Sequence, residues 1–425
     1  MSRTADLAFY GDDFTGSVDV LLQCARRGWS ARLFVGRPTP EALAAAAARH
    51  DAVGIAGIAR SLPTADLEDE VGPALDLLRG AGARIVQYKA CSTADSSPET
   101  GSLGRVLEIA AARFPGPWPL LFAQPDFGRY TAFAHHFADE RGTVYRLDRQ
   151  PTMAHHPSTP MRESDLVRHL GAQTDLPLTS IPFTAYASGG LAERIRASGP
   201  SGVLLDALDE THLRAVGAAV ADLAGIGTDR APLPVFAIGS GGLTHAVTSA
   251  DPRGTSTVPD RASGGGPVLV VSGSRSAQTR RQANAAAARG WLVQPLPLDP
   301  GADLGFVAEA LRAGRSVVLT SDDADISSVP EPDLLRAVGA ACARAARAAL
   351  ADGSTRRLVV CGGDTSSRVA TLLGVRSLSL AANPWANVVL LTAHADEEAV
   401  DGAQLLLKGG QVGSDDLFED VRALR

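Results

Sequence analysis

Residues 5–28 read ADLAFYGDDFTGSVDVLLQCARRG. The short apolar run ADLAFYG is followed by two adjacent aspartates, Asp12 and Asp13, and then by the helical pattern VDVLLQCARRG. The apolar run predicts a buried strand that turns directly into a helix. Because a strand followed at once by a helix is the repeating unit of parallel α/β sheets, this stretch indicates the fold class.

The same alternation continues through nearly the whole chain. In the first part, the runs ARLFVG, DAVGIAG, ARIVQYK and PLLFAQ predict further buried strands with helices between them. The second half repeats the rhythm with PVLVVSGSRS, SVVLTSDD and RLVVCGGD. We therefore expect an α/β protein of two domains, each a mostly parallel sheet flanked by helices, with an interdomain cleft.

A stretch without apolar periodicity separates the two halves. Residues 239–266, GSGGLTHAVTSADPRGTSTVPDRASGGG, are dense in Gly, Ser, Thr and Pro, a composition typical of linkers. A chain of 425 residues is also too long for one ordinary hydrophobic core. The sequence therefore predicts an N-terminal domain over residues 1–250 and a C-terminal domain over residues 251–425.

Composition limits the classes of partner. The chain is 45% hydrophobic and 20% charged, as in folded globular proteins, and its net charge of −7 argues against nucleic acid or an anionic membrane. We find no apolar run of about 20 residues and no signal-peptide pattern, so a cytoplasmic location is expected. The four cysteines lack CxxC spacing, which indicates neither zinc nor disulfides. The sequence is compatible with a homo-oligomer and does not define the oligomeric state.

Lysine usage is the sharpest compositional feature. Of the 40 basic residues only Lys89 and Lys408 are lysines. A coding bias toward arginine explains the excess, and chance survival explains the two lysines equally simply. The functional alternative is that these positions need a compact charge on a flexible stem instead of a guanidinium fork.

The aspartate pair lies where α/β sheets bind ligands, at the carboxyl end of a strand. The structural alternative is that Asp13 or Thr15 caps the following helix, which leaves Asp12 unexplained. A carboxylate at this point can accept a proton from a substrate hydroxyl or hold hydroxyls by hydrogen bonds. We therefore favour a functional role for at least one of Asp12 and Asp13.

A second candidate is the loop YKACSTADSSPETGSLGR, residues 88–105, which follows the predicted strand ARIVQ. Lys89, Ser92 and Thr93 offer a cation and hydroxyl donors, a combination that suits an anionic, polyhydroxylated ligand such as a sugar acid. A solvated loop rich in turn-forming residues is the structural alternative.

The histidines give a weaker signal. Residues 146–166, RLDRQPTMAHHPSTPMRESDL, are rich in His, Pro and Arg. Adjacent histidines, as at 135–136 and 155–156, do not share a helix face, so a metal site is not favoured and metal ligands stay unassigned. The stretch is either an ordered loop that lines the cleft or a surface crossover.

Three glycine-rich turns mark the second domain. They lie in VVSGSRSAQTRRQ (residues 270–282), RLVVCGGDTSSRVA (357–370) and LLLKGGQVGSDDLF (405–418). Glycines let the backbone approach a ligand, and a helix start offers free N–H groups and a positive dipole end. None of the turns matches GxxxxGK[ST] or GxGxxG. Their repetition, with Lys408 beside two glycines, favours nucleotide phosphates over plain tight turns.

Taken in order, these segments resemble the four-carbon acid sugar kinase family over nearly the whole chain. A DDxTG element opens the N-terminal domain of that family, and GSxS with TxxQ, GG[DE]T and KxGxxG elements follow in the C-terminal domain. The matching residues are Asp12, Asp13, Thr15 and Gly16; Gly273, Ser274, Ser276, Thr279 and Gln282; Gly362, Gly363, Asp364 and Thr365; Lys408, Gly410 and Gly413.

The resemblance implies an ATP-dependent kinase that phosphorylates a terminal hydroxyl of a small sugar acid such as a 3-oxo-tetronate, threonate, erythronate or the branched 3-oxo-isoapionate. It implies Mg²⁺ at the phosphates. The implied sugar-acid residues are Asp12, Asp13, Lys89, Ser92 and Thr93, with the two aspartates catalytic. The implied ATP-binding residues are Ser274, Gly362, Gly363, Asp364, Thr365 and Gly409.

The loop after Lys89 departs from the family pattern. Many members carry K-x-D-S-T, whereas Cys91 stands here in place of that aspartate. Recognition of the substrate is therefore expected to differ from that of the four-carbon enzymes. The loop PTMAHHPSTPMRESDL, residues 151–166, resembles that of a divergent branch nearer the isoapionate enzymes. Two other functions compete with the kinase: a non-catalytic sugar-acid sensor, and a sugar-phosphate phosphatase, which the adjacent spacing of the aspartates disfavours.

Overall fold

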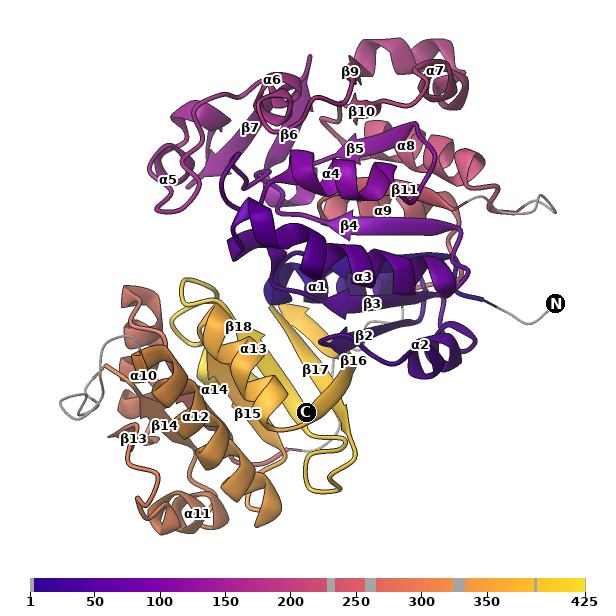
Figure 1. Cartoon of the computed structure of the whole chain (residues 1–425). Helices are drawn as coiled ribbons and strands as arrows, with labels where there is room; N and C mark the ends of the chain where they lie inside the picture. The colour runs from indigo at the N-terminus through magenta and orange to yellow at the C-terminus, as the bar shows by residue number, and fades with distance from the viewer. Residues whose placement is uncertain are drawn as a thin grey trace. The chain divides into compact units, whose positions relative to one another are not determined.

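The computed structural model describes residues 4–227, 234–256, 265–322, 324, 333–385 and 388–424. Its contacts divide the chain into two compact units: residues 1–33 with 37–257, and residues 34–36 with 258–425. Both units consist of a mostly parallel sheet with helices on its faces (Figure 1). The predicted α/β class is confirmed.

The sheet of the N-terminal unit has the strand order β2-β3-β1-β4-β11-β5-β10-β9. From β3 to β9 every neighbouring pair is parallel. Every residue of β1 and β4 is buried, as expected for strands covered on both faces. The strands are β1 (Leu7–Gly11), β2 (Ala31–Val35), β3 (Ala52–Ala56), β4 (Ile85–Lys89), β5 (Trp118–Leu121), β9 (Leu178–Ile181), β10 (Gly202–Leu205) and β11 (Val235–Gly239).

Two groups of helices cover this sheet. Helix α3 packs with α2 and α4, and α9 packs with α1 and α8. In Figure 1, α3 and α4 lie in front of the sheet and α8 and α9 behind it. The helices are α1 (Phe14–Arg26), α2 (Pro40–Ala47), α3 (Leu67–Gly80), α4 (Leu103–Ala111), α5 (Pro151–Ala154), α6 (Leu166–Gly171), α7 (Leu191–Ala197), α8 (Glu210–Leu223) and α9 (Gly241–Ala250).

The strand order of the N-terminal sheet reverses between β1 and β4. From β1 the chain proceeds to β2 and β3 on one side, and it then crosses to β4 on the other side of β1. In open α/β sheets a crevice forms at the carboxyl ends of the strands at such a reversal, and ligands bind there. The aspartates that follow β1 and the lysine that ends β4 therefore flank the expected ligand position.

The predicted linker is wrong for residues 239–250. This stretch holds the end of β11 and the whole of α9, whose N-cap Ser240 accepts a hydrogen bond from the Gly242 N–H at 3.0 Å. Helix α9 forms despite its small residues because Leu243 and Val247 are fully buried against neighbouring elements. Residues 257–264 of the predicted linker lie outside the described residues.

A small antiparallel sheet follows β5. It consists of β6 (Arg129–Ala132), β7 (His135–Glu140) and β8 (Thr143–Arg146), in that order. The His- and Pro-rich stretch 146–166 packs against it, since Leu147, Met153 and Met161 are buried in one cluster with Ala138. The stretch is thus an ordered segment with its own small core, and His155 is exposed.

A cluster of charges fixes the last described part of the N-terminal unit. The guanidinium of Arg253 lies 3.9 Å from the ring centroid of Trp29. It also donates hydrogen bonds to the carboxylates of Asp6, Asp51 and Asp251. Against burial, which raises the pKa of Asp51, the hydrogen bonds from Ser30 and Arg253 lower this pKa to about 2.

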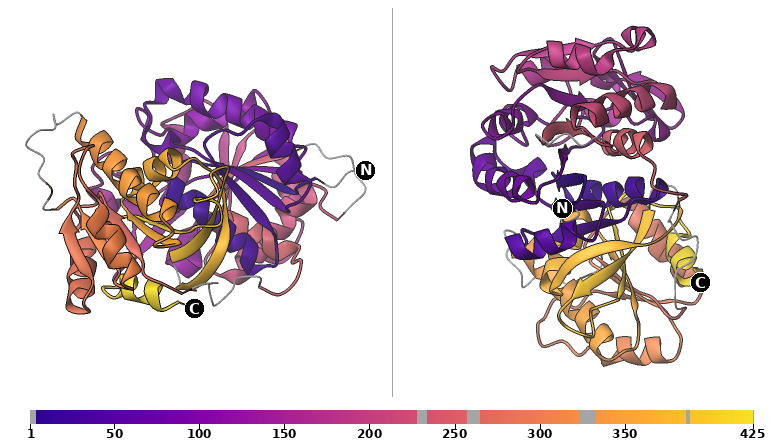
Figure 2. Two further views of the ribbon diagram at one scale, coloured as in Figure 1. Left: turned by 90° about the horizontal axis from the view of Figure 1, so that it is seen from below. Right: turned by 90° about the vertical axis from the view of Figure 1, so that its right-hand side faces the viewer.

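The sheet of the C-terminal unit has the order β13-β14-β12-β15-β18-β17-β16. Strands β13 to β18 in this order are parallel, and β17 is antiparallel to both β16 and β18. The left panel of Figure 2 shows the strong twist of both sheets. The strands are β12 (Leu269–Ser272), β13 (Leu292–Pro295), β14 (Val317–Thr320), β15 (Arg357–Cys361), β16 (Val375–Trp385), β17 (Val388–Ala395) and β18 (Gln404–Lys408).

The C-terminal sheet also reverses its strand order, between β12 and β15. Helix α12 packs with α11 and α13, and α10 packs with α14. Within the described residues, no helix is long and apolar enough to cross a membrane. The helices are α10 (Ala277–Ala288), α11 (Gly305–Arg312), α12 (Leu334–Ala351), α13 (Gly363–Leu372) and α14 (Leu417–Ala423).

Candidate active site

The strand register brings the aspartate pair next to Lys89. Gly11 of β1 lies opposite Lys89 of β4, and the Asp12 N–H donates a hydrogen bond of 3.0 Å to the Lys89 carbonyl. Sequence analysis could place both residues at strand ends but could not show that the strands are neighbours. The predicted sugar-acid residues Asp12, Asp13 and Lys89 therefore come together at one edge of the sheet.

Asp13 caps helix α1, a role for which the sequence offered either Asp13 or Thr15. Its backbone is extended, and its Oδ1 accepts a hydrogen bond of 2.8 Å from the Gly16 N–H. Thr15 is exposed and does not cap the helix. A Cβ at position 16 would lie 2.5 Å from Asp13 Oδ1 and 3.0 Å from Lys89 Nζ, so it would displace these two charged groups. The glycine thus lets both charged groups approach the first turn of α1.

Asp12 has a different partner, Arg60, which the sequence analysis missed. Arg60 Nη2 donates to Asp12 Oδ1 at 2.7 Å and to Asp13 Oδ1 at 2.9 Å. Arg60 belongs to the 3₁₀ turn η1 (Ala59–Ser61), which follows β3, and β3 is the neighbour of β1. An arginine just after the predicted strand DAVGIAG was the available signal, and it was hidden among 38 arginines.

Burial separates the two carboxylates. The Asp12 side chain is 2% exposed and that of Asp13 is 31% exposed. Burial raises the pKa of Asp12, while the charge of Arg60 opposes the rise and that of Asp13 adds to it. Asp12 is therefore a structural partner of the guanidinium, whereas Asp13 has a side chain that a ligand can reach.

The loop after Lys89 runs beside Arg60. Thr93 Oγ1 donates to Asp95 Oδ1 at 2.6 Å, so the Cys91 thiol, 3.0 Å away, donates to Thr93. Burial raises the pKa of Cys91 to about 11, with Asp95 adding to the rise and Arg60 opposing it. At neutral pH this position therefore carries a neutral thiol. Ser92 is half-buried and Thr93 buried.

In the C-terminal unit the three predicted glycine-rich turns converge. A Cβ on Gly273 would lie 2.2 Å from Thr365 Oγ1, and one on Gly410 would lie 2.4 Å from Ser274 Oγ. The turns after β12, β15 and β18 therefore lie against one another, and a Cβ at either glycine would displace the hydroxyl that it meets. Gly362, with φ of 114°, also requires glycine.

The helix that follows β15 has a free N-terminus. Gly362 is the N-cap of α13 and provides no side-chain hydrogen bond, while Gly363 and Asp364 are exposed. Uncapped N–H groups at a helix start bind anions such as phosphate. The predicted nucleotide residues Gly362, Gly363, Asp364 and Thr365 all lie in this first turn or immediately before it.

Lys408 ends β18 beside the same turns. Its side chain is buried, and Nζ donates to Thr279 Oγ1 at 3.2 Å. Burial lowers the pKa of Lys408, and Cys361 opposes this effect. The turn that holds Gly409 is fixed by the Thr279 hydroxyl, which donates to the Gly410 carbonyl at 2.8 Å. Both rare lysines thus lie at carboxyl ends of strands, within the two candidate half-sites.

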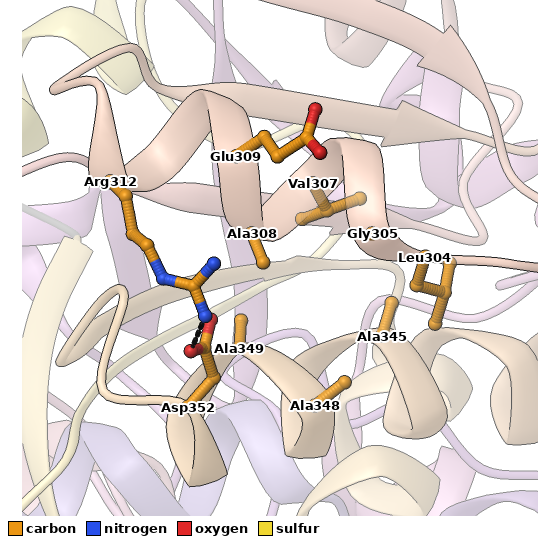
Figure 3. A pocket seen from close by; sticks show the side chains of 10 residues that line it. All are labelled: Leu304, Gly305, Val307, Ala308, Glu309, Arg312, Ala345, Ala348, Ala349 and Asp352. Carbon is orange, nitrogen blue, oxygen red and sulfur yellow. Dashed lines mark hydrogen bonds and ion pairs between the residues drawn. The ribbon is translucent and has the colours of Figure 1, made fainter.

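The described residues also contain a groove that is separate from both half-sites. It measures about 400 Å³ and lies between α11 and α12 (Figure 3). Figure 3 shows Arg312 of α11 reaching Asp352 at the end of α12, with which it forms an ion pair. Its floor of Val307, Ala345 and Ala349 is apolar, and none of the predicted site residues lines it.

Comparison with known proteins defines the class. A family model described as a sugar-binding N-terminal domain matches residues 7–247, and one described as a nucleotide-binding C-terminal domain matches residues 269–418. A solved structure from Salmonella typhimurium LT2 has the same fold, with a TM-score of 0.77, 24% identity and 99% of both chains covered. The chain is therefore a two-domain protein with a sugar half and a nucleotide half.

Curated relatives show the family. The chain is 37% identical to a 3-oxo-isoapionate kinase of Paraburkholderia graminis, over 98% of this chain and 94% of that protein. It is 31% identical to a 3-oxo-tetronate kinase of Pseudomonas fluorescens, over 97% and 95% of the two chains. The chain belongs to the four-carbon acid sugar kinase family and is a sugar-acid kinase, a phosphotransferase with an alcohol acceptor. These relatives favour neither the sensor nor the phosphatase.

Proposed function

We propose that the protein transfers the γ-phosphoryl group of ATP to a terminal hydroxyl of a branched 3-oxo sugar acid, with 3-oxo-isoapionate as the first candidate. The observation that carries the proposal is the cluster of two carboxylates and two cations at the β1–β4 reversal, Asp12, Asp13, Arg60 and Lys89. Cys91, which stands in place of the family's loop aspartate, and the isoapionate kinase among the relatives support a substrate other than the four-carbon acids.

In this proposal Asp13 is the base. Phosphoryl transfer needs an acceptor for the proton of the attacking hydroxyl, and the acceptor must reach that hydroxyl. Asp13 is the more exposed carboxylate, and its cap and Arg60 hold it in place. The hydroxyl oxygen attacks the γ-phosphorus, the bond to the ADP oxygen breaks, and the hydroxyl proton passes to Asp13.

Arg60 and Lys89 bind the acid, and Asp12 acts through Arg60. Asp12 fixes the guanidinium of Arg60, whose Nη2 also reaches Asp13. Lys89 Nζ donates to the Ala90 carbonyl at 2.9 Å and keeps further donor capacity for a substrate carboxylate. Ser92 and Thr93 are assigned to the substrate hydroxyls. The pair of cations compensates an anionic substrate that approaches two aspartates.

The nucleotide is assigned to the turns of the C-terminal unit, with Ser274, Gly362, Gly363, Thr365 and Gly409 against the phosphates and Lys408 as their cation. Mg²⁺ in kinases is held by one or two carboxylates and the phosphate oxygens, and when bound it neutralises phosphate charge. Asp364 fits this need, since it is an exposed carboxylate in the first turn of α13.

The test is ATP consumption across four-carbon, five-carbon and branched 3-oxo sugar acids. Asp13→Asn keeps the helix cap but lowers the basicity, so we expect turnover to fall roughly 10²- to 10⁴-fold with unchanged Mg-ATP affinity. Asp209→Asn is the matched control, because Asp209 caps α8 in the same way. Wild-type turnover in Asp13→Asn would overturn the assignment of the base.

Nucleotide binding is tested separately by thermal shift. Mg-ATP at about 100 times its Kd stabilises the protein by about 2.7 kcal/mol if the nucleotide half is assigned correctly. A shift with sugar acids alone, and none with Mg-ATP, would contradict the nucleotide assignment.

A further inference from the structure

We infer that His136 is a positioning residue for the sugar-acid loop, residues 91–97: its imidazole holds the Ser92 carbonyl and thereby the hydroxyls of Ser92 and Thr93. The inference rests on the proposed function, since it gives His136 a role in binding the acid. His136 comes from β7 of the small antiparallel sheet, outside the main sheet that carries the charged cluster.

The contacts of the ring fix its tautomer. Nε2 lies 2.8 Å from the Ser92 carbonyl oxygen, and Nδ1 lies 2.9 Å from Thr131 Oγ1. Because a carbonyl oxygen only accepts hydrogen bonds, Nε2 must carry the proton. Nδ1 of the neutral ring then accepts from the Thr131 hydroxyl. Each ring nitrogen thus has one partner, and only one of the two partners belongs to the loop.

The ring remains neutral at physiological pH. The side chain is fully buried, and burial lowers the pKa of His136 to about 4, with the Ser92 carbonyl opposing this effect. A neutral donor in this place binds the carbonyl without adding a charge to the neighbouring cluster of aspartates and cations. His136 therefore positions the loop and does not act as an acid or a base in the reaction.

A second contact holds the other end of the loop. His169 Nε2 of α6 lies 3.0 Å from Ser96 Oγ, and Gln173 Nε2 donates to the same hydroxyl at 3.0 Å. Between the two fixed serines lies Ala94, whose φ of 51° is unusual for a residue other than glycine. A loop with such a residue needs contacts at both ends to keep one conformation.

The small sheet is itself anchored to the main sheet. The carboxylate of Asp206, which follows β10, accepts hydrogen bonds from the N–H groups of Phe133 at 2.6 Å and Ala134 at 3.1 Å. These two residues form the turn between β6 and β7 and both have positive φ. Contacts therefore run without interruption from β10 through this turn to His136 and the loop.

The experiment compares His136→Phe with His136→Gln in the full-length protein. Phenylalanine keeps a ring but removes the donor that His136 provides to the Ser92 carbonyl, so the KM for the sugar acid is expected to rise roughly 5- to 100-fold. The kcat and the Kd of Mg-ATP stay within about twofold, because the lost contact acts on ground state and transition state alike. The glutamine amide reaches the position of Nε2 and restores most of the KM.

Two further variants keep the test decisive. His135→Phe is the control: it alters the neighbouring residue of β7, whose Nδ1 contacts Ser164 instead of the loop. If His136→Phe does not fold, His136→Asn replaces it, because the asparagine amide reaches the position of Nδ1 and leaves Ser92 without a donor. An unchanged KM in these variants, or an equal effect of His135→Phe, overturns the inference.

Hydrogen exchange distinguishes failure of the inference from failure of the proposed function. The Ala94 N–H donates to the Cys91 carbonyl at 3.1 Å within the loop. His136→Phe is expected to accelerate exchange of the loop amides at least fivefold without changing exchange in β1. If the wild type phosphorylates no sugar acid, the proposed function fails, and the exchange result alone then supports or overturns the control of the loop by His136.

Discussion

Replacing Arg60 by methionine tests whether one guanidinium holds the aspartate pair together. The variant leaves Asp12, only 2% exposed, as a buried carboxylate without its ion-pair partner. Breaking a buried pair from one side costs about 3–5 kcal/mol. Because the Arg60 side chain is 24% exposed, we take the lower part of this range, about 3–4 kcal/mol at pH 7. The N-terminal unit should then unfold roughly 6–16 °C lower.

The loss should depend on pH with a definite sign. In the folded protein burial raises the pKa of Asp12, so protonation of Asp12 stabilises the fold. This contribution is complete below the unfolded value of 3.8 and disappears as the pH rises through the folded value. Without Arg60 the folded pKa rises further, and the difference between Arg60→Met and the wild type should therefore shrink as the pH falls from 7 toward 5.

Scanning calorimetry at several pH values is the assay. Adding Asp12→Asn to Arg60→Met removes the unpaired charge and should recover more than half of the lost stability. Arg146→Met is the control, because Arg146 pairs with Asp148 at the surface, where such pairs contribute about 0–1 kcal/mol. Equal shifts in Arg60→Met and Arg146→Met, or no recovery with Asp12→Asn, would refute the reasoning.

Two more predictions concern the nucleotide half. In Gly273→Ala the new Cβ would lie 2.2 Å from Thr365 Oγ1, so Thr365 must shift in the turn assigned to the phosphates. The Kd of Mg-ATP measured by titration calorimetry should then rise at least about tenfold, and an unchanged Kd would contradict the assignment of these turns to the phosphates. Lys408 has a pKa lowered by burial, and a bound phosphate favours its charged form. Nucleotide binding should therefore take up protons increasingly as the pH rises toward this pKa, an uptake that is absent from Lys408→Met and that calorimetry in two buffers measures.

The strands and the positions of the candidate site residues at their ends were predictable, because an apolar run and the polar residues that follow it are both local features of the sequence. Apolar runs such as ADLAFYG and RLVVCGGD became β1 and β15, and the polar residues after them lie at strand ends as expected. What sequence could not supply was the order of the strands. That order places Lys89 beside Asp12 and the turn of Ser274 beside that of Thr365. The assignment of these residues to substrate and ATP stays a prediction.

The failures have physical causes. Helix α9 was mistaken for a linker because its Gly, Ser and Thr residues have low helix propensity, and packing of Leu243 and Val247 outweighs that propensity. Arg60 was missed because its partners, Asp12 and Asp13, lie 48 and 47 positions earlier in the chain, and the sequence does not show this contact. The role of His136 was hidden for the same reason, since its partner Ser92 lies 44 positions away.

The charge cluster of Arg253 determines where an N-terminal fragment of the chain can end. The sugar-binding family model ends at residue 247, yet Arg253 forms ion pairs with Asp6 and Asp51 and covers the ring of Trp29. A fragment cut at the family boundary would keep both carboxylates and the indole but lose Arg253, although Asp6 would keep its ion pair with Arg84 and Asp51 its hydrogen bonds from Ser30. An autonomous N-terminal fragment should therefore extend at least through Gly254, which packs against Gly28. Homology alone would set its end about seven residues too early.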